Sequence, residues 1–290
     1  MSVAAGFAGA AVAAALALAL AWKWQLGMAR SATGLGVMAA VGGAAALAAG
    51  AALGLADGVR ALLGAVLTLV VAAGVLAYRF YRDPERTAPA GEHLVVSPAD
   101  GTVVYVKRCR DGRAPVASKR GREVALRELT HTDVHTGDAV VVGIAMSFLD
   151  VHVNRAPIAG RVLLRRHFPG RFGSLRRPES VFENERVTTL IGGAGGLEVA
   201  VVQIASRLVR QIASFVGEGD KVALGQRIGV IRLGSQVDLV LPARRDLSVM
   251  VGKGDRVSAG TSVIAMVGAG GLGTRRTGAA AMAGSAGSAG

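Results

Sequence analysis

Apolar and charged residues are distributed very unevenly along this chain. Three long stretches in its N-terminal part contain no charged residue: 3–22, 31–56 and 61–78. Each is about as long as the roughly 18 to 20 residues with which a helix crosses the hydrocarbon core of a bilayer. We therefore predict a membrane anchor over residues 1–80, with three transmembrane helices.

The second stretch, 31–56, consists mostly of Ala and Gly and is only weakly apolar per residue. Two interpretations stay open: it inserts by itself, or its small residues pack closely against a neighbouring helix. A cleaved signal peptide is a less favoured explanation of the first stretch, because no basic segment precedes it and further apolar stretches follow.

The loops between these stretches differ in charge. Asp57 and Arg60 offset each other after the second stretch. Basic residues follow the first and third stretches, at Lys23, Arg30, Arg79, Arg82 and Arg86. Because cytoplasmic loops carry the excess of Lys and Arg, we predict an inner-membrane protein whose first loop and C-terminal part face the cytoplasm.

The formal net charge of the chain is +13. On a membrane-anchored protein this favours attraction to anionic lipid, through the arginines after the third stretch and a second cluster. That second cluster consists of Arg165, Arg166, Arg171, Arg176 and Arg177. Nucleic acid is a less favoured partner, since aromatic residues are few and no known binding signature is present. The single cysteine, Cys109, excludes an intramolecular disulfide and a thiolate zinc cluster.

From Leu94 to Val267 the pattern changes to short β-branched runs separated by Gly, Pro and Asp. This spacing predicts a mainly antiparallel β-domain, a sandwich or barrel with few short helices, within residues 81–267. Residues 206–215 fit a helix or a strand equally. The tail, 268–290, is rich in Gly, Ala and Ser, and we predict that it is disordered.

One internal repeat is visible. Residues 216–231 and 251–266 share Val-Gly-x-Gly-Asp-basic-Val and a later Gly, 35 residues apart. Two such turns resemble the half-motifs of barrel-sandwich hybrid folds, the architecture of lipoyl and biotinyl domains. A carrier function is not favoured, because Lys221 lies inside the repeat rather than at a hairpin tip.

Five motifs follow one another along the chain: YRFYRDPERTAP at 78–89, VVSPADGTVV at 95–104, MSFLDVHVNRAPIAGRV at 146–162, NER at 184–186 and LGSQVDLVLP at 233–242. Together they resemble the phosphatidylserine decarboxylase family, pyruvoyl enzymes that make phosphatidylethanolamine. The combination is specific, although no single motif is. The resemblance implies a membrane-bound carboxy-lyase that releases CO₂ from an aminophospholipid.

The resemblance also implies that the Gly234-Ser235 bond is cut by the protein itself. Ser235 Oγ attacks the Gly234 carbonyl, and β-elimination of the resulting ester leads to a pyruvoyl group on residue 235. The products are chains 1–234 and 235–290. The pyruvoyl ketone forms a Schiff base with the substrate amine and acts as the electron sink, with no pyridoxal phosphate or metal. On local grounds alone, Gly-Ser in a strand fits a bulge or a tight turn.

A serine hydroxyl needs a general base, and histidine is the usual one. The resemblance makes His152 the candidate base and Asp100 the residue that orients it, as in a Ser-His-Asp arrangement. From the sequence alone Asp100 is equally a turn residue before Gly101. One branch of the family has a second His where this chain has Arg155. Whether His152 serves self-cleavage, decarboxylation or both therefore stays open.

Arg155 and Arg186 are candidates for binding the substrate phosphate or carboxylate, because a guanidinium binds either in a two-pronged way. A structural salt bridge, with Asp150 or Glu185, explains each of them at least as well.

Two other functions fit parts of the sequence. A non-enzymatic membrane adaptor with a lipoyl-like β-domain would not need the hydroxyl of Ser235, and it usually carries long heptad helices, which are absent. A zinc peptidase would use His131 and His135, but their spacing indicates no third ligand, so we predict no metal. The lipid backbone of the substrate, an archaeal-type serine lipid included, and a homo-oligomeric state stay open.

Overall fold

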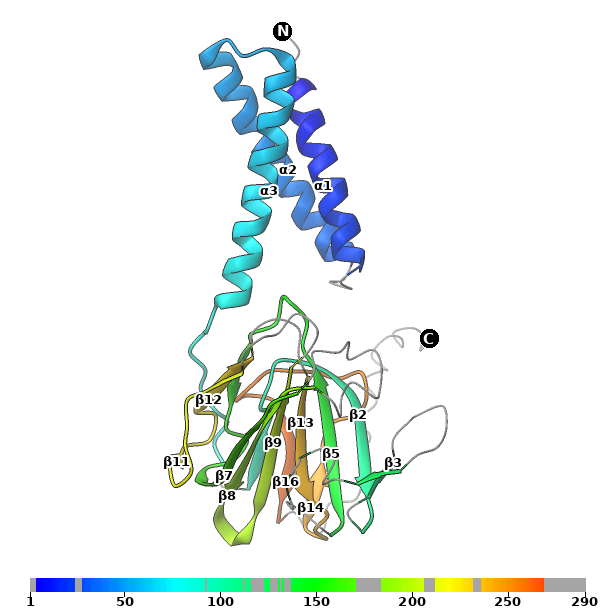
Figure 1. Cartoon of the computed structure of the whole chain (residues 1–290), viewed down its shortest axis with the longest axis vertical. Helices are drawn as coiled ribbons and strands as arrows, with labels where there is room; N and C mark the ends of the chain where they lie inside the picture. Colours follow the sequence, from blue (N-terminus) through cyan, green and yellow to red (C-terminus); the bar gives the residue numbers. More distant parts are fainter. Residues whose placement is uncertain are drawn as a thin grey trace, which may run out of the picture.

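The structure is a computed structural model, and it describes residues 4–23, 28–91, 93–111, 113–115, 123–125, 130, 132, 137–170, 184–205, 212–231 and 236–268. Within these residues the chain forms three N-terminal helices followed by an antiparallel β-domain (Figure 1). This confirms the predicted fold class. The tail predicted to be disordered lies outside the described residues, except for Gly268.

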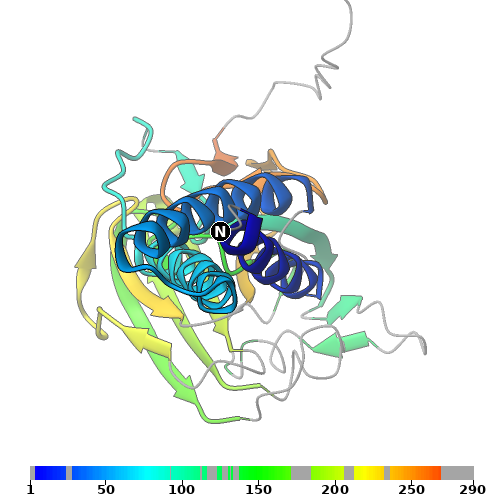
Figure 2. The ribbon, with the colours of Figure 1, turned by 90° about the horizontal axis from the view of Figure 1, so that it is seen from above.

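The helices are α1 (Ala4–Lys23), α2 (Met28–Leu53) and α3 (Asp57–Tyr81), each long and apolar enough to cross a membrane. The chain runs toward the β-domain in α1, away from it in α2 and back in α3, and the three helices lie together above the domain (Figures 1 and 2). Many large apolar side chains on them are exposed, such as Val12, Leu16 and Leu62. Such a surface suits contact with lipid rather than water.

The third helix begins earlier than the sequence suggests. Asp57 and Arg60, expected in a loop, form its first turn, where an acidic residue complements the positive end of the helix dipole. Arg60 is buried, donates to the Gly50 carbonyl at 3.0 Å and lies 3.8 Å from the Asp57 carboxylate. The buried guanidinium thus contacts a carbonyl of α2 and a carboxylate of its own helix.

The small residues of α2 pack closely against its neighbours. A Cβ on Gly42 would lie 2.3 Å from Thr68 Oγ1 of α3, and one on Gly43 would lie 2.5 Å from the Phe7 ring of α1. Only glycine permits such close approach between helices. The Gly/Ala-rich composition of the second stretch thus has a packing role.

The described strands are β1 (Leu94–Val96), β2 (Gly101–Cys109), β3 (Arg113–Pro115), β4 (Glu123–Ala125), β5 (Ala139–Ala145), β6 (Val153–Arg155), β7 (Gly160–Phe168), β8 (Arg186–Gly192), β9 (Glu198–Ile204), β10 (Ile212–Ser214), β11 (Lys221–Val222), β12 (Arg227–Ile231), β13 (Gln236–Pro242), β14 (Leu247–Val249), β15 (Arg256–Val257) and β16 (Val263–Val267). A short 3₁₀ helix, η1 (Ala194–Gly196), joins β8 to β9.

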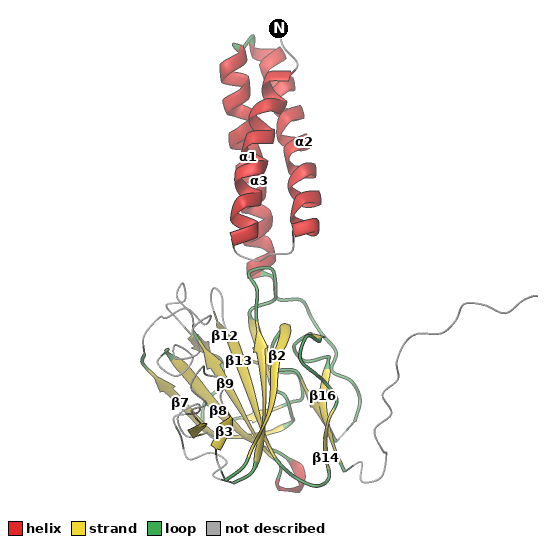
Figure 3. Ribbon diagram, turned by 90° about the vertical axis from the view of Figure 1, so that its right-hand side faces the viewer, coloured by secondary structure: helices red, strands yellow, loops and turns green. Residues whose placement is uncertain are grey.

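Eight strands form one antiparallel sheet in the order β11-β7-β8-β9-β13-β5-β2-β15. The sheet curls, and the smaller sheets β1-β16-β14 and β10-β12-β6 lie against it (Figure 3). Its central strands are buried on both faces, because one apolar cluster covers each side. This explains why β5, β9 and β13 read as continuous apolar runs rather than as alternating ones.

The repeat seen in the sequence forms two equivalent turns. Asp220 Oδ2 accepts a hydrogen bond from the Gly217 amide at 2.8 Å, and Asp255 Oδ2 accepts one from the Gly252 amide at 2.8 Å. The strand after the first turn, β11, pairs with β7, and the strand after the second, β15, pairs with β2.

The strand starts that receive these turns are also a repeat, which reading the sequence did not reveal. They are SPADGTV at 97–103 and APIAGRV at 156–162. The Val96 amide donates to the Pro157 carbonyl at 2.9 Å, and the Arg155 amide donates to the Pro98 carbonyl at 2.9 Å. Such reciprocal bonds show an approximate two-fold. We call 97–103 with 251–266 the first half of the β-domain, and 156–162 with 216–231 the second half.

Candidate active site

The candidate residues gather at the end of the large sheet that faces the helices. There β5 and β9 end and β13 begins, so that Ala145 and Ile204 flank Gln236. The short helix η1 marks the opposite end (Figure 3). Gly234 and Ser235 lie outside the described residues, in the connection between Ile231 and Gln236.

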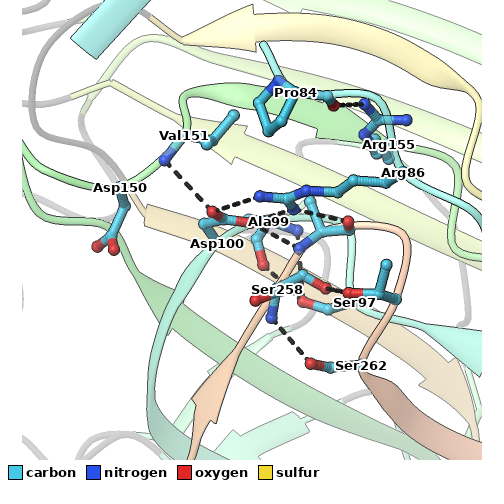
Figure 4. Close-up of polar contacts among 12 residues, drawn as sticks. Pro84, Arg86, Ser97, Ala99, Asp100, Asp150, Val151, Arg155, Ser258 and Ser262 are labelled. Atoms are coloured by element: carbon cyan, nitrogen blue, oxygen red, sulfur yellow. Dashed lines mark hydrogen bonds and ion pairs between the residues drawn. The ribbon is translucent and has the colours of Figure 1, made fainter. Parts of the chain in front are cut away.

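Asp100 lies in the turn before β2 and is largely buried. Its carboxylate accepts hydrogen bonds from Arg86 Nη1 at 2.5 Å, Arg86 Nη2 at 2.8 Å and the Ala259 amide at 2.7 Å, and a longer one from the Val151 amide at 3.4 Å (Figure 4). Burial alone would raise the pKa of Asp100, but these bonds and the charge of Arg86 outweigh it and hold the pKa below its ordinary value. Asp100 is therefore ionised at neutral pH.

Arg86 was predicted to attract anionic lipid, and the structure corrects this. Its side chain is only 14% exposed, and its guanidinium binds Asp100 and the Ala259 carbonyl, the latter at 2.8 Å. A side chain bound in this way is not available to the membrane surface.

His152 is buried, with 1% of its surface exposed. The ring of Phe80, in the last turn of α3, packs against it with centroids 4.3 Å apart. Burial lowers the pKa of His152, and the Asp150 backbone and the carboxylates of Asp150 and Asp100 offset this in part. The ring is thus neutral near pH 7, which is the form that takes a proton.

The Asp150 backbone favours the charged form of the ring, but its geometry is too poor for a hydrogen bond, and among the described residues neither ring nitrogen of His152 has a well-formed hydrogen bond. Asp100 therefore does not bond to His152 in this structure. It reaches the same segment through the amide of Val151, the preceding residue. The His152 carbonyl in turn accepts from the Ile231 amide at 3.2 Å, which fixes the end of β12 beside the histidine.

Arg155, in β6, is buried and bound to the chain that leaves α3. It donates to the Gly225 carbonyl at 3.0 Å, the Pro84 carbonyl at 3.0 Å and Asp83 Oδ1 at 3.4 Å. Its ion-pair partner is thus Asp83, whereas Asp150 pairs with Arg256 at 2.6 Å.

Arg186, at the start of β8, is fully buried and donates to the Asn184 carbonyl through Nε and Nη2, each at 3.2 Å. Burial lowers its pKa to about 10, so it stays charged at neutral pH. Glu185 Oε1 lies 2.8 Å from Nε2 of His167. The substrate-binding roles of Arg155 and Arg186 stay predictions.

A buried polar network directly follows the candidate cleavage site. Asp238 Oδ2 accepts from the Tyr105 hydroxyl at 2.7 Å, and its Oδ1 accepts from Gln236 Nε2 at 2.7 Å. Burial raises the pKa of Asp238 to about 6. Asp238 is the charged residue of the LGSQVDLVLP motif and was assigned no role from the sequence, although a buried carboxylate with a shifted pKa near a candidate site is itself a signal.

His131 and His135, the weighed metal ligands, lie outside the described residues. Within the part of the chain that the structure describes, no group of three or more His, Cys, Asp or Glu is arranged to hold a metal ion. Cys109 is buried, and burial raises the pKa of its thiol to about 11, which makes it unreactive.

The arrangement combines a neutral buried histidine, an ionised aspartate held by an arginine, and a set of helices suited to a bilayer. These features define the class of the protein. It is a β-domain attached to helices suited to a bilayer, with candidate acid-base residues at the end of the sheet nearest the helices.

The family is shown by sequence comparison. The profile of the family described as phosphatidylserine decarboxylase matches residues 74–265, which is more than half of the chain, and the chain belongs to this family. This confirms the resemblance stated from the motifs.

Individual relatives agree. A phosphatidylserine decarboxylase proenzyme of Erythrobacter litoralis is 42% identical over 200 residues, 68% of this chain and 75% of the relative. One of Pelobacter propionicus is 38% identical over 189 residues, 65% of this chain and 76% of the relative. A protein of Methanocaldococcus jannaschii named "Putative archaetidylserine decarboxylase proenzyme" is 41% identical over 189 residues, 64% of this chain and 87% of the relative.

Proposed function

We propose that the chain is a self-processing, pyruvoyl-dependent decarboxylase that converts phosphatidylserine to phosphatidylethanolamine and CO₂. The observation that carries this is the family match together with the site: of the described residues on either side of Gly234-Ser235, Ile231 donates to the His152 carbonyl and Gln236 lies between Ala145 and Ile204. Residues 1–80 are the anchor, residues 81–267 the catalytic domain, and 268–290 a tail. The positive-inside rule places the catalytic domain on the cytoplasmic face of the inner membrane.

Self-cleavage begins with proton transfer from Ser235 Oγ to His152. A neutral, buried imidazole whose ring nitrogens have no partner among the described residues can accept that proton, and the nearby charge of Asp100 favours the imidazolium that forms. Ser235 Oγ then bonds to the Gly234 carbonyl carbon. The amide nitrogen takes the proton from His152 and leaves as an amine, which gives an ester.

The ester is broken by β-elimination. Removal of the Ser235 α-proton expels the Gly234 carboxylate from Cβ and leaves dehydroalanine at residue 235. Its imine tautomer takes up one water, releases ammonia and becomes the pyruvoyl group. One water is consumed in total, and the products are chains 1–234 and 235–290.

The residues present fit such a group. Its position would follow Ile231 and precede Gln236, at the end of the sheet where His152 lies buried without a described hydrogen-bond partner. The pyruvoyl group supplies a ketone for the substrate amine and a neighbouring carbonyl that accepts the electrons released with CO₂. The protein residues hold the headgroup there, and His152 is the candidate to move protons at it.

The substrate is a lipid whose headgroup is phosphoserine. Relatives named for phosphatidylserine and for archaetidylserine match almost equally well, at 42% and 41% identity, and both lipids carry this headgroup. The reacting atoms are therefore the same, and the exposed apolar helices hold the site at the surface where the headgroup lies.

The test is the intact mass of the purified full-length protein beside Ser235→Ala. We expect two fragments from the wild type, with a pyruvoyl mass at the start of the smaller one, and one uncut chain from the variant. Release of CO₂ from vesicles of phosphatidylserine or of an archaeal serine lipid then identifies the lipid. A folded wild-type chain that stays uncut would remove the enzyme and leave the membrane adaptor.

A further inference from the structure

The five residues that leave α3, 82–86, run along the candidate site and bind to it; we call them the strap. Arg82 Nη2 donates to the Leu149 carbonyl at 3.2 Å, in the turn before His152. Asp83 and Glu85 pair with Arg227 at 2.5 and 2.7 Å, and Asp83 and the Pro84 carbonyl also bind Arg155. The strap is thus fixed to β6, which directly follows His152, and to β12, which precedes the candidate cleavage site.

The strap ends in Arg86, which forms the strongest of these contacts. Both terminal nitrogens bind the Asp100 carboxylate, one to each oxygen, and Nη1 also binds the Ala259 carbonyl (Figure 4). The two side chains are 14% and 10% exposed. A two-pronged, largely buried pair of this kind sets the position of a carboxylate as well as its charge.

Asp100 connects three parts of the site through this pair. Its carboxylate binds the strap, the Ala259 amide after β15 and the Val151 amide before His152. Besides Arg86, the titratable groups that bear on this carboxylate are His152 and, through Arg86, Asp83. If Arg86 were removed, burial would favour the protonated acid, and the negative charge beside His152 would be lost.

We propose that Arg86 is a positioning residue for self-cleavage, which holds the Asp100 carboxylate charged and in place beside His152, and that the strap thereby ties the site to the membrane anchor. This inference rests on the proposed function.

The experiment measures self-cleavage of the full-length chain in membranes, by intact mass over time, from mildly acidic to mildly alkaline pH. Arg86→Gln is compared with Arg86→Lys and with Arg244→Gln. Arg244 is a matched control at the opposite end of the sheet, because it also binds one carboxylate with two nitrogens, that of Asp246, and one backbone carbonyl.

We expect Arg86→Gln to slow cleavage by about 30-fold or more at neutral pH, and to recover in part toward alkaline pH as Asp100 ionises again. Arg86→Lys, which keeps the charge but not the two prongs, should fall in between. Arg244→Gln should cleave like the wild type. A positioning role predicts that the rate of Arg86→Gln falls more at acidic than at alkaline pH. General damage to the fold would instead lower the rate equally at every pH.

The inference would be overturned if Arg86→Gln cleaved itself at the wild-type rate, or if its rate were lowered by the same factor at all pH values. Either result would leave the proposed function intact. If Arg86→Gln fails to fold, the lysine variant decides: an unchanged rate and pH profile in Arg86→Lys would also overturn it. An uncut wild type would instead sink the proposed function, so the two failures are distinguishable.

Discussion

In the first half of the β-domain Asp100 precedes Gly101, and in the second half Ala159 occupies the equivalent place before Gly160. The backbones match at each step: the Gly260 amide donates to the Ser97 carbonyl at 2.8 Å, as the Gly225 amide does to the Ala156 carbonyl at 2.9 Å. Of the positions that differ between the two segments, only 100 carries a carboxylate, and that carboxylate is bound by Arg86. The two halves therefore share a backbone scaffold, and the candidate acid-base residue is present in the first half only.

The largest effect should come from making the first half resemble the second. Asp100→Ala removes the charge beside His152, and we expect self-cleavage to slow by about 10,000-fold, since removal of the aspartate from a Ser-His-Asp arrangement has effects of this order. The reverse change, Ala159→Asp, places a carboxylate at an exposed position and should leave the rate within about twofold. The measurement is the rate of appearance of chain 1–234. Fast cleavage by Asp100→Ala would contradict any role for this carboxylate.

Asp238 sharpens the comparison, because it is a buried carboxylate whose pKa moves in the opposite direction. Its pKa in the folded protein is about 6, above the ordinary value, so the protonated form favours folding. This contribution is complete below about pH 4 and is lost as the pH rises through about 6, on the order of 3 kcal/mol in total.

In an uncut Ser235→Ala background, Asp238→Asn should remove this decline in the melting temperature between about pH 4 and pH 6. Asp100 has a lowered pKa, so its contribution should follow the reverse trend and be lost as the pH falls. Parallel pH dependences for Asp238→Asn and the parent protein would show that Asp238 is not titrating in this range.

The equivalent glycines Gly225 and Gly260 offer a smaller contrast. Both have φ of +75°, where a side chain is strained. A Cβ on Gly260 would also lie 2.8 Å from Arg155 Cδ, whereas the nearest atom to one on Gly225 lies at 3.2 Å. We expect Gly260→Ala to lower the free energy of unfolding by about 2 to 3 kcal/mol and Gly225→Ala by about 1 to 2. Thermal unfolding in detergent measures both, and equal losses would argue against the closer packing around Arg155.

The turn aspartates should differ least. Asp220→Ala and Asp255→Ala each remove one exposed hydrogen bond to a glycine amide, of the same length in both halves. Each should cost about 0.5 to 1 kcal/mol. Melting temperatures that differ markedly between the two variants would show that the halves are not equivalent at their turns.

The sequence predicted those features that depend on local pattern. The first apolar stretch, 3–22, became α1, and the Gly-x-Gly-Asp repeat became two matching turns. The start of α3 was misplaced, since Asp57 and Arg60 look like loop charges until Gly50 makes room for the Arg60 side chain.

The structure places the candidate residues His152 and Asp100 at the same end of the sheet, but the contacts that hold them there could not be predicted from the sequence. His152 and Asp100 were found through the motifs, yet the partner of Asp100 is Arg86, and Arg155 binds Asp83, 72 residues away in the chain. Such pairings depend on how β6 and the strap come together in space, and no periodicity records them. The 97–103 and 156–162 repeat was missed because only its Pro, Gly and Val positions are shared.

The order of strands gives the proposed cut a lasting consequence. Strand β13 lies between β9 and β5, and β16 lies between β1 and β14. After a break before β13, this strand of the smaller product would therefore still be paired on both sides with strands of the larger product. The mature protein would be a two-subunit complex that never had to assemble, and its one-to-one stoichiometry would be set at translation rather than by the abundance of two partners.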